Sequence, residues 1–141
     1  MTWIELVAFV CASNFTPQLP DQIKSAALEF EVDETLVLSI IHTESRCDPN
    51  ALGSSNDTGM MQIIPKWHQQ RIDNLRVDNL FDPYQNIRVG SSLLSSLNVN
   101  EDITNALVIY NGGYAKPPQS YKYAEKVISK LNYYNSLITR Q

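Results

Sequence analysis

The chain contains 141 residues with a mass of 16.0 kDa, of which 43% are apolar and 18% are charged. This size and balance are typical of one globular domain and exclude a disordered chain or a coiled coil. A formal net charge of −4 and an isoelectric point near 5.0 argue against binding to nucleic acid, because phosphate backbones attract basic surfaces. No run of about 18 apolar residues is present, so no membrane-spanning segment is expected. We expect a single domain over residues 1–141 that acts as a monomer.

Residues 1–16 are expected to contain an N-terminal helix. The stretch from Trp3 to Ala12 is apolar enough to resemble a signal peptide, but Glu5 interrupts it. No Lys or Arg precedes the stretch and no cleavage site of small residues follows it cleanly, although a signal peptide has both. We therefore interpret this segment as a helix with one side facing the core.

Two further helices are predicted in the first third of the chain. The first begins at Pro20 and runs through Phe30, with apolar residues at helical spacing. The second is capped by Asp33, whose side chain can accept backbone N–H groups of the first turn, and it ends near Arg46 because a proline follows closely. Residues 48–58 are polar and rich in turn-forming residues, which predicts a loop.

Three more helices are predicted in the second half. Asp82 and Pro83 are typical of an N-cap and a first helical position, and they open a helix through about Leu97. A shorter, more apolar helix covers 102–110 and ends before two consecutive glycines, and a long final helix covers 120–138. The pattern predicts a mostly α single-domain fold of about six to seven helices with little or no sheet.

The two cysteines, Cys11 and Cys47, cannot form a metal site alone, and no cluster of metal-ligating residue types surrounds His42 or His68. The pair is compatible with one disulfide in a protein that works outside the cytoplasm. It is equally compatible with two buried thiols, because a free cysteine packs as a small apolar residue. The sequence leaves both states open.

Glu44 is the candidate catalytic residue. It lies four residues after Ile40 and eight after Leu36, so a helix places all three on one face. A carboxyl group on a buried face is partly desolvated, which raises its pKa and lets it carry a proton near neutral pH. Such a group can act as a general acid. The alternative is a glutamate at a helix end that reaches water or pairs with Arg46.

Several motifs follow one another in a fixed order. They comprise residues 44–51 (ESRCDPNA) with 59–65 (GMMQIIP), then 82–87 (DPYQNI), 106–113 (ALVIYNGG) and 123–127 (YAEKV). Together they resemble the catalytic domain of soluble-type lytic transglycosylases, which share a lysozyme-like fold with goose-type lysozyme. The resemblance extends over about residues 20–134 and implies that fold for this chain.

The resemblance implies a lyase that acts on peptidoglycan. Such an enzyme cleaves the β-1,4 bond between N-acetylmuramic acid and N-acetylglucosamine without water and leaves 1,6-anhydromuramic ends. Glu44 matches the family's catalytic acid, which protonates the glycosidic oxygen and then, as a carboxylate, accepts the proton of the muramic 6-hydroxyl. The resemblance implies no metal and no organic cofactor.

The resemblance also implies a set of substrate-binding residues, comprising Ser54, Asp57, Met61, Gln62, Tyr110, Asn111 and Tyr123. Ser54 is included because Gly53 occupies the place where many relatives have a serine that contacts substrate. Four members have a structural alternative: Met61 as a core residue, Gln62 as a loop-stabilising amide, Asn111 as a helix C-cap and Tyr123 as part of an apolar stripe.

Asp57 distinguishes two enzymatic mechanisms. It precedes Gly59 by two residues, a place similar to that of the second carboxylate of chicken-type lysozymes, and some secretion-associated transglycosylases also have an aspartate there. We interpret it as a second carboxylate, an electrostatic stabiliser or the cap of a turn. A muramidase that uses Glu44 and Asp57 to activate water is therefore the alternative enzyme.

A non-catalytic wall-binding or structural virion component is the alternative from another class, which the joint presence of Glu44, Gln62 and Tyr110 disfavours. The expected partner is the glycan strand of peptidoglycan, and virion or secretion-apparatus proteins are further expected partners. Because no export signal is recognised, we expect action at the cell wall or in the periplasm after delivery by a phage or a secretion machine.

Overall fold

The computed structural model describes residues 1–138, which form seven α-helices and two short 3₁₀ helices. In chain order these are α1 (Trp3–Val10), α2 (Leu19–Glu29), α3 (Glu34–Ser45), η1 (Pro65–Trp67), α4 (Gln69–Asn74), α5 (Pro83–Ser96), α6 (Ile103–Gly112), η2 (Gly113–Ala115) and α7 (Pro118–Leu137). The prediction of a mostly α fold with about six to seven helices is therefore confirmed over this range.

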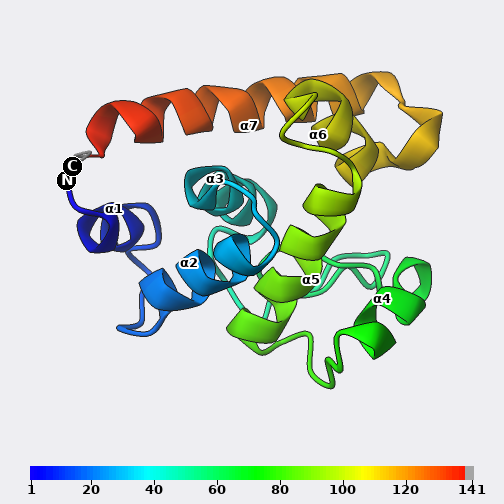
Figure 1. Cartoon of the computed structure of the whole chain (residues 1–141), viewed down its shortest axis with the longest axis horizontal. Coiled ribbons are helices and arrows are strands. Elements are labelled where there is room, and N and C mark those ends of the chain that lie inside the picture. The colour runs from blue at the N-terminus through cyan, green and yellow to red at the C-terminus, as the bar shows by residue number, and fades with distance from the viewer. Residues whose placement is uncertain (139–141) are drawn as a thin grey trace.

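Helix α3 forms the centre of the fold. Its residues 35–41 are all buried, and it packs against both α2 and α7. Figure 1 shows α7 running across the molecule on one side of α3, while α1 and α2 lie on the other side. Helix α5 packs along α2, and α6 packs against α7. A helix that is apolar around most of its circumference must be enclosed in this way, and its last turn then reaches the edge of the core.

The predicted helix starts follow the capping residues. Asp33, Asp82 and Asp102 each accept a hydrogen bond from a backbone N–H in the first turn of α3, α5 and α6 respectively, at 3.0 Å in every case. The N-terminal helix is shorter than the predicted range of 1–16 because it ends at Val10. The last helix begins two residues before the predicted start at Ser120, because Pro118 occupies its first turn.

Residues 65–74 form two short helices that the sequence pattern did not predict. Both η1 and α4 are short, and α4 buries only Ile72. One buried apolar residue in six cannot produce a periodic signal, so tertiary contacts select this conformation. None of the helices in the described range is long and apolar enough to cross a lipid bilayer.

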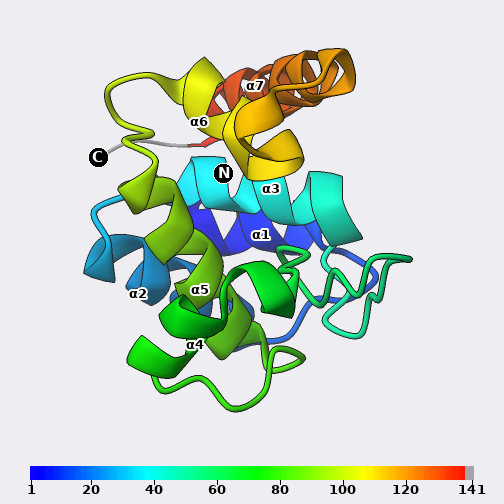
Figure 2. The same ribbon diagram turned by 90° about the vertical axis from the view of Figure 1, so that its right-hand side faces the viewer.

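The loop at residues 48–64 is held by short backbone pairings and by one buried side chain. Two isolated antiparallel β-bridges pair Leu52 with Thr58 and Thr58 with Ile63. Asn86 of α5 is fully buried; its amide donates to the carbonyls of Thr58 and Leu80, and its oxygen accepts the N–H of Met61, all at 2.8 Å. Figure 2 shows this loop projecting beyond the end of α3.

Cys11 and Cys47 form a disulfide across a sequence separation of 36 residues, with their Cα atoms 5.5 Å apart. The structure thus decides between the two states that the sequence left open. Both residues are almost fully buried, at 1% and 0% exposure. The bond ties the segment after α1 to the first turn of the loop that follows α3.

Candidate active site

Glu44 lies in the last turn of α3, one residue before the end of the helix. The helix stops because Arg46 and Cys47 both adopt left-handed backbone conformations, with φ of 52° and 66°. Ser45 Oγ donates to the carbonyl of Met60 at 2.8 Å and so holds the returning loop against the helix end. Ser45 therefore has a structural role at the turn.

The carboxyl group of Glu44 is largely removed from water. Burial raises its pKa from 4.5 to about 7, although a hydrogen bond from Tyr123 acts in the opposite direction and the negative charge of Asp57 adds to the increase. Tyr123 Oη donates to Glu44 Oε2 at 2.8 Å. The group therefore exchanges a proton near neutral pH, which is the first of the two interpretations that the helical spacing left open. It forms no ion pair with Arg46.

Two tyrosines from the C-terminal helices surround Glu44. Tyr123 projects from α7 and Tyr110 from α6. Burial, together with the negative charge of Glu44, raises the pKa of both phenols well above 10. Tyr110 Oη donates to the carbonyl of Met61 at 2.7 Å. Residues far apart in sequence thus meet at one carboxyl group, with Tyr110 also connecting α6 to the 48–64 loop.

Asp57 lies on the loop side of the site. Its carboxylate accepts the backbone N–H of Ser55 at 3.2 Å, which is the turn-capping role considered above. It also lies against Gly53, where any Cβ would collide with the carboxylate. A side chain at position 53 would therefore require the Asp57 carboxylate to move. Since its charge also acts on Glu44, Asp57 combines a structural role with an electrostatic one.

Two of the predicted substrate contacts belong to the loop framework. The Met61 side chain is fully buried and packs against Gly90, which is the core position considered above. Its contact with substrate stays a prediction. Gln62 Nε2 donates to the carbonyls of Ala51 and Gly59 at 3.2 and 3.0 Å. Its side-chain oxygen makes no hydrogen bond within residues 1–138 and remains able to accept one from a ligand.

Asn111 and Ser54 form no hydrogen bond with Glu44 in the described part of the chain. Asn111 is exposed at the end of α6, where its side-chain oxygen accepts the hydroxyl of Ser120 at 2.7 Å and joins α6 to α7. Ser54 is exposed on the turn at 53–56. The roles of both residues toward a ligand stay predictions.

Sequence reasoning missed Asn86 as a supporting residue of the site. The motif at 82–87 contains it, but a buried asparagine inside a helix has no sequence signal of its own. Gly59 depends on it, since a Cβ at this position (φ +76°) would meet the Asn86 amide and the carbonyl of Leu80. Among residues 1–138, no group of three or more His, Cys, Asp or Glu side chains is placed to hold a metal ion.

The fold is shared with solved lytic transglycosylases. The 70 kDa soluble lytic transglycosylase of Escherichia coli superposes with a TM-score of 0.73 over 83% of this chain and 24% of its own, at 19% identity. An inactive mutant of the lytic transglycosylase Slt from Pseudomonas aeruginosa superposes with a TM-score of 0.75 over 86% of this chain and 24% of its own, at 18% identity. The chain therefore has the lysozyme-like helical fold of these enzymes.

The profile of the transglycosylase SLT domain matches residues 21–132, and the chain belongs to this family. It is 31% identical over 116 residues to the transglycosylase of Enterobacteria phage PRD1. This alignment covers 79% of this chain and 42% of the phage protein. It is 29% identical over 141 aligned positions to the membrane-bound lytic murein transglycosylase C of Photorhabdus laumondii, covering 84% of this chain and 40% of that protein. The chain thus spans about two fifths of the length of these relatives.

Proposed function

We propose that the protein is a peptidoglycan lytic transglycosylase that cleaves the bond between N-acetylmuramic acid and N-acetylglucosamine without water. The observation that carries this proposal is the partly buried Glu44 carboxyl group, with a pKa of about 7 and a hydrogen bond from Tyr123. A group that is protonated about half the time near neutral pH can both give and take a proton in one catalytic cycle. Membership of the transglycosylase SLT domain family supports the same activity.

In the proposed reaction, protonated Glu44 donates its proton to the glycosidic oxygen as the bond from that oxygen to the muramic anomeric carbon breaks. The muramic 6-hydroxyl then attacks the anomeric carbon, and the Glu44 carboxylate accepts the hydroxyl proton. The products are a free N-acetylglucosamine 4-hydroxyl and a 1,6-anhydro ring, and Glu44 regains its starting proton. No water is consumed, so one carboxyl group performs both proton transfers.

The neighbours of Glu44 have positioning roles in this proposal. Tyr123 donates to Oε2 and so leaves Oε1 to carry the mobile proton toward the sugar. Tyr110 holds the main chain of the 48–64 loop through Met61. The loop side then offers Gln62 and Ser54 to the glycan strand, which we propose as the substrate and principal partner of a monomeric enzyme.

Product analysis tests the proposed function. Purified peptidoglycan is digested with the protein, and the soluble fragments are analysed by mass spectrometry. Muropeptides with 1,6-anhydromuramic ends are expected. Fragments with reducing ends would support the muramidase alternative, which the charge of Asp57 near Glu44 favours, and the absence of products would support a non-catalytic wall-binding component.

We expect activity to decline as the pH rises above about 7. The acid form of Glu44 is lost as the pH passes its pKa of about 7, so kcat/KM should fall about tenfold per pH unit on the alkaline side.

The stability of the fold should also depend on pH through Glu44. Because the folded pKa exceeds the unfolded value of 4.5, this group favours folding most below pH 4.5 and progressively less up to about pH 7. The unfolding free energy of the wild type, measured relative to that of Glu44→Gln, should therefore decrease as the pH rises across that interval. A difference that is independent of pH would contradict the raised pKa.

Replacement of Asp57 separates the two enzymatic mechanisms. Asp57→Asn should retain anhydro products and lose at most about tenfold in rate, because an internal hydroxyl nucleophile requires no second carboxylate. The alkaline limb of the pH profile should also move to lower pH, since the negative charge of Asp57 raises the pKa of Glu44. Asp78→Asn, which changes an exposed carboxylate elsewhere, is the matched control. A loss of about 10² or more in Asp57→Asn with an intact fold would support the muramidase mechanism instead.

The biological setting follows as a further part of the proposal. The similarity to a transglycosylase of phage PRD1 supports a phage origin for this protein. The similarity to a lytic murein transglycosylase supports action at the cell wall. We propose local wall degradation by a phage or a secretion machine, with proteins of that assembly as partners.

A further inference from the structure

A hollow of about 350 Å³ lies between the η1–α4 segment and α5. Its lining contains none of the residues that surround Glu44. It is formed mainly by polar side chains and one indole ring, including Trp67, His68, Gln70, Arg71, Asn74 and Ser92. Converging polar groups beside an aromatic surface in a concave site can fix the orientation of a polar ligand.

Arg71 carries a positive charge in this hollow that no carboxylate neutralises within residues 1–138. Its guanidinium donates to the hydroxyls of Ser92 and Ser96 at 2.7 and 3.1 Å, while its buried Nε has no hydrogen-bond partner. Burial without a counter-charge lowers the pKa of this arginine. A partly buried guanidinium whose terminal nitrogens have only neutral partners can attract an anion to the hollow.

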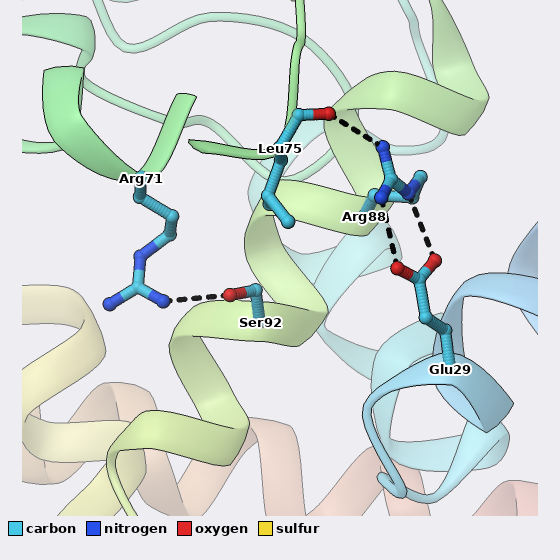
Figure 3. A network of polar contacts seen from close by, with 5 residues as sticks. All are labelled: Glu29, Arg71, Leu75, Arg88 and Ser92. Carbon is cyan, nitrogen blue, oxygen red and sulfur yellow. Dashed lines mark hydrogen bonds and ion pairs between the residues drawn. The ribbon is translucent and has the colours of Figure 1, made fainter. Parts of the chain in front are cut away.

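Arg88 on α5 provides an internal comparison. Figure 3 shows both arginines: Arg88 makes two parallel bonds to the Glu29 carboxylate, each of 2.9 Å, and a third to the carbonyl of Leu75 at 3.0 Å. Arg71 reaches only a serine hydroxyl in the same view. The fold therefore satisfies one arginine with its own carboxylate and leaves the other available to an external one.

The indole of Trp67 lies beside this charge and is 69% exposed. Lys66 Nζ is 4.8 Å from the ring centroid and adds a second positive charge. An exposed tryptophan offers a flat apolar surface, and the C–H face of a pyranose ring can pack on such a surface. An aromatic platform next to an unneutralised arginine matches a sugar that bears an acidic group.

We propose that this hollow is a second glycan-binding site, which holds a carboxylate-bearing amino sugar with its ring on Trp67 and its carboxylate at Arg71. The choice of N-acetylmuramic acid as that sugar rests on the proposed function. N-acetylmuramic acid differs from N-acetylglucosamine by a lactyl group that ends in a carboxylate, and this group is free where the wall peptide has been removed. The site would hold the enzyme on such strands independently of cleavage.

A pair of ligands tests the proposal. The full chain is titrated with N-acetylmuramic acid and with N-acetylglucosamine while tryptophan fluorescence is recorded. The sequence has two tryptophans, and Trp3 is buried with its indole N–H bonded to the carbonyl of Pro20 at 2.9 Å, so a change in signal reports on Trp67. We expect N-acetylmuramic acid to bind at least about tenfold more tightly than N-acetylglucosamine.

Variants assign that preference to Arg71. Arg71→Gln should remove the difference between the two sugars, Arg71→Lys should retain part of it, and Arg76→Gln, which removes an exposed arginine nearby, should leave it unchanged. Circular dichroism verifies that each variant is folded. If Arg71→Gln does not fold, the partial loss of preference expected for Arg71→Lys tests the role of Arg71 instead. Equal affinity for the two sugars, a preference unaffected by Arg71→Gln, or no fluorescence change with either sugar would overturn the proposal.

The binding readout separates this inference from the proposed function. Sugar binding in Glu44→Gln should equal that of the wild type, because the hollow contains no residue of the candidate active site. A lack of cleavage products together with retained sugar preference would refute only the transglycosylase activity. Anhydro products together with no preference would refute only the second site.

Discussion

Glu44→Gln is expected to reduce peptidoglycan cleavage by about 10²-fold or more, because it removes the only proposed proton donor while keeping the volume and polarity of the side chain. Tyr123 can still donate its hydroxyl to the amide oxygen, so the contact between α3 and α7 is preserved. The measurement is the rate of release of soluble muropeptides, accompanied by thermal unfolding to establish that the variant is folded.

Glu101→Gln is the matched control, since it makes the same chemical change at an exposed turn before α6. It should retain the wild-type rate. The variant Glu44→Gln should also be at least as stable as the wild type at about pH 8, where the wild-type carboxyl group must be charged in a desolvated place. Residual activity above about 1% in a folded Glu44→Gln protein would contradict the assignment of the general acid.

Removal of the disulfide is expected to have the largest effect on stability. Cys11 and Cys47 close a loop with a sequence separation of 36 residues, for which the chain-entropy relation gives about 3–4 kcal/mol. The double variant Cys11→Ala/Cys47→Ala should therefore unfold about 10 °C or more below the oxidised wild type. Because Cys47 begins the loop that follows Glu44, the cleavage rate should also decrease.

A reducing agent provides the control for the disulfide prediction. It should lower the unfolding temperature of the wild type toward that of the double variant and leave the double variant unchanged. Both cysteines are buried, so reduction is measured after brief unfolding and refolding with the reductant present. Equal unfolding temperatures for oxidised and reduced wild type would show that the bond does not stabilise the fold.

Local sequence determined where most helices begin and which residue is the candidate acid. The caps Asp33 and Asp82 act on their own first turns, so their effect is local and can be inferred without tertiary structure. The position of Glu44 four residues after Ile40 placed it on the buried face and made a raised pKa one of two open interpretations, and the family resemblance favoured that interpretation over a glutamate that reaches water. Its catalytic role stays a prediction.

Tertiary structure alone decided which distant groups meet at that carboxyl group. Nothing in the spacing of the last helix indicates whether Tyr123 joins the core or reaches Glu44, because the choice depends on how α7 crosses α3. The same holds for the burial of Met61, for the three hydrogen bonds of Asn86, and for the pairing of Cys11 with Cys47. Periodicity and capping report on contacts within one element. Side-chain partners 25 to 79 residues apart, such as Asn86 with Met61 and Tyr123 with Glu44, depend instead on the packing of several elements at once.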